Sequence, residues 1–204
     1  ALSLVEGRFR KHERPTVMKN VFIISGAAGS GKDSIIDRLQ SILPVERIIT
    51  TTTRPMRPGE EEGNPYYFVS HENFEARIAA GEFIEYSTNE NGGFCGVTQA
   101  ELERMADKEG IVLWRVDWKG VMTIKKLHPE IPAIYISAPL EVLEARLRKR
   151  DKNKDEAYFQ ERMDYTRTWM DHLDIYDYQV QNEEGKLDQT VQRVKAIIES
   201  HLEK

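Results

Sequence analysis

A short apolar segment that runs directly into a glycine-rich turn constrains the fold of this chain more than any other feature. The segment Val21–Ser25 reads Val-Phe-Ile-Ile-Ser, which is typical of a buried β-strand, and Gly26-Ala-Ala-Gly-Ser-Gly-Lys32 follows at once. Beyond the turn, apolar residues at positions 35, 36, 39 and 43 have the spacing of an amphipathic helix. Strand, glycine loop and helix in this order are the context in which GxxxxGK forms a phosphate-binding P-loop.

The chemistry of this loop follows from its residue types. Its glycines allow successive backbone N–H groups to turn toward a β-phosphate, and the N-terminus of the next helix adds partial positive charge. Lys32 is placed to bridge the β- and γ-phosphates of ATP during a phosphoryl transfer. The residues expected to contact ATP here are Gly26, Ala27, Ala28, Gly29, Ser30, Gly31, Lys32, Asp33 and Ser34.

The residue after the lysine departs from the usual P-loop. Serine or threonine normally stands there and its hydroxyl binds Mg²⁺, whereas this chain has Asp33 followed by Ser34. A carboxylate oxygen is also a hard ligand. We therefore expect Asp33 to hold Mg²⁺, directly or through water.

Short apolar strands alternate with amphipathic helices along the rest of the chain. Helical runs include Gln99–Lys108, which the capping box Thr98-x-x-Glu101 opens. This alternation predicts an α/β fold of the P-loop NTPase type, a parallel sheet with helices on both faces. Strands are expected at Val21–Ser25, Tyr66–Val69, Phe83–Tyr86, Ile111–Val116, Ala133–Ser137 and Tyr178–Val180, with another near Arg47–Thr51.

Two segments break the alternation. Half-polar strands and the turn Asn91-Gly92-Gly93 predict a small mixed α/β lobe at about 54–97, inserted in the core. The polar stretch Asp151–Asp155 between two helices predicts a helical lid at about 148–165. The core is then expected at 18–53 and 98–204, and residues 1–17, which are polar, read as a disordered leader or tag.

Composition excludes several classes of protein. The net charge is −5 and no run of lysine and arginine stands apart from acidic neighbours, which argues against binding to long nucleic acids. No segment approaches the roughly 18 apolar residues of a membrane span. The single cysteine, Cys95, cannot form an intramolecular disulfide, so a cytoplasmic protein is expected, as a monomer or a homodimer.

From residue 18 to the C-terminus the chain resembles the guanylate kinase family. The P-loop, the long segment Thr50–Glu60 (TTTTRPMRPGE) with Tyr66–Val69 (YYFV), Gly81–Glu85 (GEFIE) and Val116–Gly120 (VDWKG) carry the resemblance. It implies a kinase that uses ATP and Mg²⁺ to phosphorylate GMP or dGMP, and therefore no protein nucleophile.

The resemblance also implies that the lobe at about 54–97 binds the acceptor and that it contains a site for the acceptor phosphate. Arg54 and Arg57 would hold the phosphate, because guanidinium groups bind phosphate dianions through two parallel hydrogen bonds. Tyr66 would add its hydroxyl. Glu60 and Asp117 match acidic positions near the acceptor and the metal.

For the base, the resemblance implies that Thr50 and Glu85 read the guanine edge. A carboxylate can accept from N1–H and the 2-amino group together, and adenine lacks that pair of donors. Gly96 matches the glycine of a Tyr-Gly-Ser triplet in the family's acceptor site. In this chain the triplet is Cys95-Gly96-Val97. A thiol is a weak hydrogen-bond donor and a valine side chain has no donor, so this chain lacks two polar contacts to the acceptor that the family's triplet provides.

In the second half of the chain the resemblance implies a lid that carries arginines. Arg146 and Arg150, on the helix after Ala133–Ser137, and Arg162, beyond the polar break, would neutralise charge on the transferring group. Asn182 matches a position near the adenine of ATP.

Further departures leave two alternatives open. Arg115 stands two residues before Asp117, where the family carries an acid, and Trp169 replaces another acid. The Gly-Ser-Gly-Lys-Asp-Ser loop and Gly96-Val97 are similar to ribose 1,5-bisphosphate phosphokinase, although the guanine-reading Glu85 favours GMP. The second alternative is a non-catalytic guanylate-kinase-like scaffold, which would typically lack the P-loop glycines and lysine that this chain retains.

Overall fold

A computed structural model describes residues 20–88, 92–106 and 108–203. The expected leader at 1–17 and Asn91 of the expected turn lie outside these residues. The described chain forms two compact units: Asn20–Arg47 with Lys108–Lys204, called the P-loop unit below, and Ile48–Asp107, called the lobe unit. The sequence places the lobe at about 54–97, so the lobe unit is wider at both ends.

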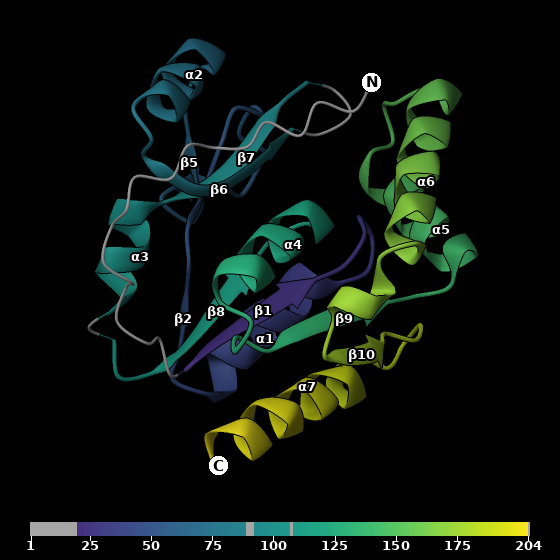
Figure 1. Ribbon diagram of the computed structural model, residues 1–204. Helices are drawn as coiled ribbons and strands as arrows, with labels where there is room; N and C mark the ends of the chain where they lie inside the picture. Colours follow the sequence, from purple (N-terminus) through teal and green to yellow (C-terminus); the bar gives the residue numbers. More distant parts are fainter. Residues whose placement is uncertain (1–19, 89–91, 107, 204) are drawn as a thin grey trace. The chain divides into compact units, whose positions relative to one another are not determined.

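The P-loop unit is built on a five-stranded parallel sheet with the order β10-β9-β1-β8-β2 (Figure 1). Its central strand, β1, is buried at all five positions, as expected for a parallel sheet covered on both faces. The predicted α/β class is confirmed. The strands are β1 (Val21–Ser25), β2 (Val45–Arg47), β8 (Ile111–Arg115), β9 (Ala133–Ser137) and β10 (Tyr178–Gln181).

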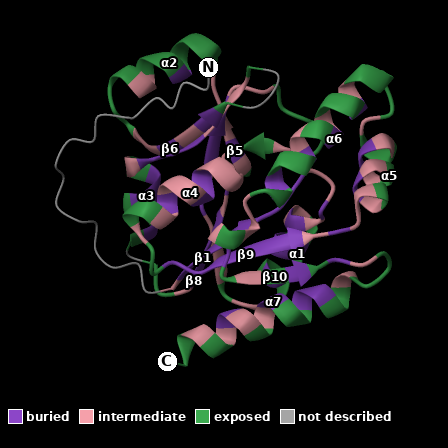
Figure 2. Ribbon diagram, turned by 45° about the vertical axis from the view of Figure 1, so that its right-hand side comes forward, coloured by how far each residue is buried: buried purple, intermediate pink, exposed green. Residues whose placement is uncertain are grey.

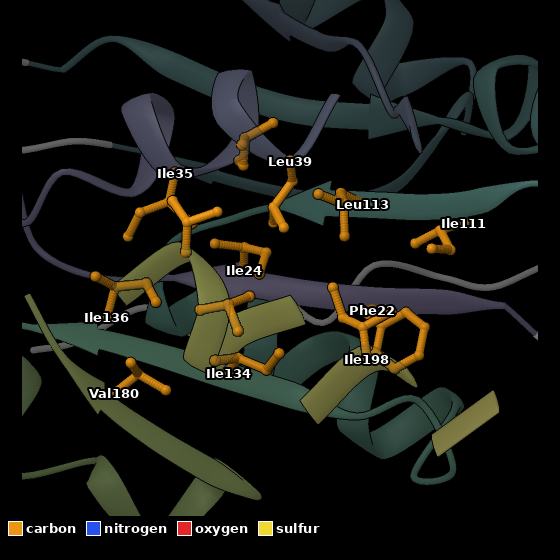
Figure 3. Packing of buried hydrophobic residues seen from close by; sticks show 13 residues of the cluster. Phe22, Ile24, Ile35, Leu39, Ile111, Leu113, Ile134, Ile136, Val180 and Ile198 are labelled. Carbon is orange, nitrogen blue, oxygen red and sulfur yellow. The ribbon is translucent and has the colours of Figure 1, made fainter. Parts of the chain in front are cut away.

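Helices cover both faces of this sheet. On one face α1 and α7 pack against alternate residues of the strands, including Phe22, Leu113 and Ile134, and form one apolar cluster (Figure 3). α4 lies on the other face (Figure 1). None of the described helices combines the length and the hydropathy needed to cross a membrane. The helices are α1 (Lys32–Ile42), α4 (Trp118–Leu127), α5 (Leu140–Arg150), α6 (Glu156–Met170), the short 3₁₀ helix η1 (Leu173–Ile175) and α7 (Leu187–Leu202).

The lobe unit has a five-stranded mixed sheet with the order β4-β5-β3-β7-β6. β3 pairs with β5 in parallel and with β7 antiparallel. Phe74 of α2 is fully buried and stacks on Phe83 and Phe94, with ring centroids 4.2 and 5.0 Å away (burial is coloured in Figure 2). The elements are β3 (Thr50–Thr52), β4 (Glu61–Glu62), β5 (Pro65–Phe68), α2 (His71–Ala79), β6 (Phe83–Thr88), β7 (Phe94–Thr98) and α3 (Gln99–Ala106).

Some expected boundaries are wrong. The strand expected near Arg47–Thr51 is two strands, β2 and β3, which belong to different units. β4 and β7 are not predicted from the sequence, because their residues lack a clear apolar alternation. Of the capping box expected at the start of α3, one half is present: the backbone N–H of Glu101 donates to Thr98 Oγ1 at 3.3 Å. The Glu101 carboxylate instead accepts from the backbone N–H of Ile49 at 2.7 Å.

Candidate functional site

The P-loop is a tight turn between β1 and α1 that needs glycine at three positions, Gly26, Gly29 and Gly31, all with positive φ. Gly26 and Gly31 have φ values of 155° and 86°. A Cβ on Gly26 would lie 2.4 Å from the carbonyl oxygen of Ile136, and a Cβ on Gly31 would lie 2.3 Å from Nδ2 of Asn182. Both contacts are sterically forbidden, so the glycine pattern of the sequence is explained by the room that the loop leaves.

Asn182, which follows β10, supports this loop directly. Its side chain is buried, Nδ2 donates to the carbonyl oxygen of Ser30 at 2.8 Å, and Oδ1 accepts from Thr190 Oγ1 at 3.2 Å. Asn182 also lines a cavity of about 260 Å³ in the P-loop unit. The other lining residues are Gly31, Ser34, Arg146, Glu183, Glu184, Gly185 and Leu187. Asn182 is therefore both a brace of the P-loop and part of the wall of a ligand-sized cavity.

Lys32 is the first residue of α1 and is 8% exposed. Its Nζ donates to the carbonyl oxygen of Ala27, inside the loop, at 3.3 Å. Burial lowers the pKa of Lys32 to about 7, and the positive charge of Arg115 acts in the same direction, while Asp33 opposes both. The lysine is thus poised to gain a proton when anionic phosphates arrive.

ATP binding is expected to take up protons above neutral pH for this reason. In the free protein Lys32 is largely neutral at pH 8, and bound phosphate would favour its charged form. Calorimetric titrations with ATP in buffers of different ionisation enthalpy should give an uptake approaching one proton at pH 8 and close to none at pH 6. An uptake that is the same at both pH values would contradict the assignment to Lys32.

Asp33 lies in an unexpected environment. Its Oδ1 accepts from Nη2 of Arg47 at 2.8 Å and lies 2.9 Å from Nε of Arg115. Desolvation would raise the pKa of Asp33, but the charges of Arg115, Lys32 and Arg47 outweigh it and hold the pKa far below its usual range. The carboxylate is therefore a permanently charged partner of two guanidinium groups.

Arg47 and Arg115 are the members of this site that the sequence does not identify. They end β2 and β8, two neighbouring strands of the sheet, and so lie at the edge from which the P-loop also leaves. Cationic side chains at the carboxyl ends of parallel strands are well placed for an anionic ligand. The only sequence signal is Arg115 itself, a basic residue where the resemblance to guanylate kinases implies an acid.

The three expected lid arginines belong to two groups. Arg146 of α5 donates from Nη1 to the carbonyl oxygen of Gly29 at 3.2 Å and pairs with Glu184 at 2.8 Å, so it contacts the P-loop and the cavity wall. Arg150 forms two hydrogen bonds with Asp151, at 2.9 and 2.7 Å.

Tyr158 connects the remaining pair. Its hydroxyl donates to the Asp151 carboxylate at 2.9 Å, and the guanidinium of Arg162 lies over its ring at 5.3 Å. The structure thus gathers Arg150 and Arg162 around Tyr158, between α5 and α6.

Asp117, one of the expected acceptor residues, caps α4 in the P-loop unit, because its Oδ1 accepts from the backbone N–H of Gly120 at 2.9 Å.

In the lobe unit, Arg54 is held in a fixed orientation. Its guanidinium forms two hydrogen bonds with the Glu60 carboxylate, one of them 2.7 Å long, and its centre lies 4.5 Å from the centroid of the Tyr66 ring. Glu60 also accepts from the backbone N–H of Arg57 at 2.8 Å. Four of the expected acceptor residues therefore form one group, in which the Glu60 carboxylate orients the Arg54 guanidinium through two hydrogen bonds.

Thr50, Glu85 and Gly96 lie on three strands of the lobe sheet, in which β7 stands between β3 and β6. Thr50 of β3 is paired with Tyr66 of β5, and Glu85 of β6 is paired with Val97 of β7. Glu85 is a buried carboxylate, 5% exposed, beside a β-bulge that starts after Phe83. Bulges re-aim side chains near binding sites, and no sequence pattern announces this one.

Gly96 and its neighbours explain the departures in this strand. A Cβ on Gly96 would lie 2.7 Å from the carbonyl oxygen of Glu85, so the glycine allows β6 and β7 to approach. Val97 is fully buried. Cys95 Sγ lies 3.3 Å from Thr52 Oγ1, a contact within the sheet.

The P-loop lies at the carboxyl end of a parallel sheet, with a buried lysine and several arginines around it. These features define a P-loop phosphotransferase, and comparison with known proteins supports this class. The family described as guanylate kinase matches residues 18–201. Guanylate kinases of Idiomarina loihiensis and Hahella chejuensis are 37% and 35% identical to the chain, over 82% and 87% of its length and 81% and 84% of theirs. The crystal structure of guanylate kinase from Anaplasma phagocytophilum superposes with a TM-score of 0.71 at 27% identity, covering 91% of this chain and 87% of that one.

The chain therefore belongs to the guanylate kinase family. It is an ATP-dependent nucleoside monophosphate kinase, as the resemblance of its sequence predicts.

Proposed function

We propose that this enzyme transfers the γ-phosphate of ATP to GMP or dGMP, giving ADP and the corresponding diphosphate, and that Mg²⁺ enters as a complex with the phosphates of ATP. The observation that carries the choice of acceptor is the buried carboxylate of Glu85 on β6. A carboxylate accepts hydrogen bonds and donates none, and the guanine edge offers N1–H and the 2-amino group side by side as matching donors.

The proposed roles divide between the units. In the lobe unit Arg54 and Arg57 hold the acceptor phosphate, with Tyr66 beside them and Glu60 orienting Arg54. In the P-loop unit the backbone of the loop binds the β-phosphate, and Lys32 neutralises charge that shifts during transfer.

The other donor-side residues complete this proposal. Arg146, Arg150 and Arg162 are the further cations for the transferring group, and Asn182 supports the loop. Catalysis in such a site consists of positioning and electrostatic stabilisation. A cytoplasmic location and a monomeric or homodimeric state are part of the same proposal.

An ADP-release assay with a panel of acceptors tests it. With ATP and Mg²⁺, GMP and dGMP are expected to be turned over at least about 100-fold more efficiently than AMP, UMP and CMP, because those bases do not present the paired N1–H and 2-amino donors of guanine. Ribose 1,5-bisphosphate is the acceptor that separates the phosphosugar alternative. Turnover of this compound in preference to GMP would refute the proposal.

A further inference from the structure

Two departures from the usual sequence pattern, far apart in the chain, meet in the P-loop unit. Asp33 stands where P-loop proteins carry the hydroxyl that binds Mg²⁺, and Arg115 stands two residues before Asp117, where the resemblance to guanylate kinases implies an acid. In the structure Oδ1 of Asp33 lies 2.9 Å from Nε of Arg115, and Oδ2 lies 3.4 Å from Nη2. The hydroxyl and the acid are thus replaced together, by a carboxylate and a guanidinium that form an ion pair.

This set of groups does not fit a side-chain site for Mg²⁺. Arg47 approaches the same Asp33 oxygen at 2.8 Å, so both oxygens of the carboxylate face guanidinium groups. A divalent cation bound there would lie against two like charges. Within residues 20–88, 92–106 and 108–203, no group of three or more histidine, cysteine, aspartate or glutamate side chains offers another ligand set.

We propose that Arg115 is a binding residue for the β- and γ-phosphates of ATP and that Asp33 positions it, so that this pair supplies charge which other P-loop proteins obtain from a protein-held Mg²⁺. The proposal rests on the proposed function only in taking ATP as the donor. Asp33 is then a positioning residue in place of the metal ligand expected from the sequence.

The position of Arg115 supports contact with the phosphates. It is the last residue of β8 and pairs in register with Ile24 of β1, two residues before the P-loop. Ligands of parallel α/β sheets bind at this end of the strands. The Arg115 side chain is 21% exposed, and its charge is the strongest electrostatic influence on Lys32, the residue expected to bridge the phosphates.

Arg47 is the less suitable of the two arginines. Its side chain is only 10% exposed, and it is shared between Asp33 and Asp37, both on α1, at 2.8 and 3.8 Å. Arg47 therefore holds Asp33 in place from the side of β2. Asp33 in turn orients Arg115, because a guanidinium keeps its orientation best when a carboxylate faces its donors.

Calorimetric binding of ATP in the absence of any acceptor tests the proposal, once with EDTA and once with excess Mg²⁺. In the wild type, Mg²⁺ is expected to tighten ATP binding by less than about threefold, since the protein does not hold the metal. Arg115→Gln should weaken metal-free ATP binding by about tenfold, and Arg115→Lys should recover part of the loss. Asp33→Asn should weaken it less, and should add nothing to Arg115→Gln because it acts through Arg115.

The double variant Asp33→Ser/Arg115→Asp restores the usual hydroxyl and acid. Mg²⁺ is expected to tighten its ATP binding by about 30-fold or more, while its metal-free binding is weaker than that of the wild type. Equal dependence on Mg²⁺ in the wild type and this variant would overturn the proposal, and so would unchanged metal-free binding in Arg115→Gln.

Two controls separate this test from other failures. Melting temperatures of the ligand-free variants exclude unfolding, and Arg115→Lys keeps the charge if Arg115→Gln does not fold. Because no acceptor is present, a lack of GMP turnover alongside the expected binding pattern would count against the proposed function alone.

Discussion

Replacing Lys32 with methionine is expected to lower turnover at least about 10³-fold, the size of effect seen when a single preorganised cation is removed from a phosphoryl-transfer site. Methionine fills nearly the same volume, so the loop geometry set by Gly26 and Gly31 should persist. The reason is electrostatic: the side chain is 8% exposed and directed into the loop, where negative charge develops during transfer. Steady-state ADP release and a direct binding measurement with ATP would separate loss of catalysis from loss of affinity.

The same variant should be more stable than the wild type in the absence of ligand. The pKa of Lys32 is lowered to about 7 by burial, so the folded protein disfavours the charged lysine that the unfolded chain carries. This cost is complete below pH 7 and disappears as the pH rises toward the ordinary lysine pKa of about 10.4. Lys32→Met is therefore expected to raise the free energy of unfolding by about 1–3 kcal/mol at pH 6.5, and by less at pH 9.

Lys126→Met is the matched control, because Lys126 is an exposed residue of α4. It should change neither turnover nor the melting temperature appreciably. A Lys32→Met protein that is less stable than the wild type at pH 6.5, or that retains normal turnover, would contradict the account of this residue.

The P-loop could be predicted from the sequence because its determinants are local. A buried strand, glycines at fixed spacing and an amphipathic helix each leave a pattern within a few residues, and the structure explains the glycines by contacts with Ile136 and Asn182. The acceptor group around Arg54 is similar, since Glu60 and Arg57 are close in the chain and pair across one turn.

The environment of Asp33 could not be predicted in this way. It depends on β8 lying beside β1 and on β2 lying beside β8, which brings Arg115 and Arg47 to one edge of the sheet from positions far apart in the chain. The boundary between β2 and β3 was not predicted for a related reason. The run from Arg47 to Thr51 looks like one β-branched strand, although Arg47 belongs to the P-loop unit and Ile48 to the lobe unit.

Glu85→Gln is expected to lower kcat/KM for GMP by about 100-fold and to leave the affinity for ATP unchanged. Glutamine keeps the shape of the side chain but replaces one acceptor oxygen by an NH₂ group, which would face a donor of guanine with a donor of its own. Because Glu85 is buried on β6, water cannot readily restore the hydrogen bond to the base that the substitution removes. Initial rates with GMP and AMP, together with ATP titrations, would measure the effect.

The specificity ratio is the sharper readout, because adenine offers an acceptor at N1 and a donor at its 6-amino group, which an amide can match. The preference for GMP over AMP is therefore expected to fall by more than the GMP rate alone. Glu75→Gln, an exposed change on α2 in the same unit, should leave both unchanged. If Glu85→Gln kept the wild-type preference, the guanine edge would have to be read by another group. Thr50, a buried residue of β3 in the same sheet, would be the next residue to test.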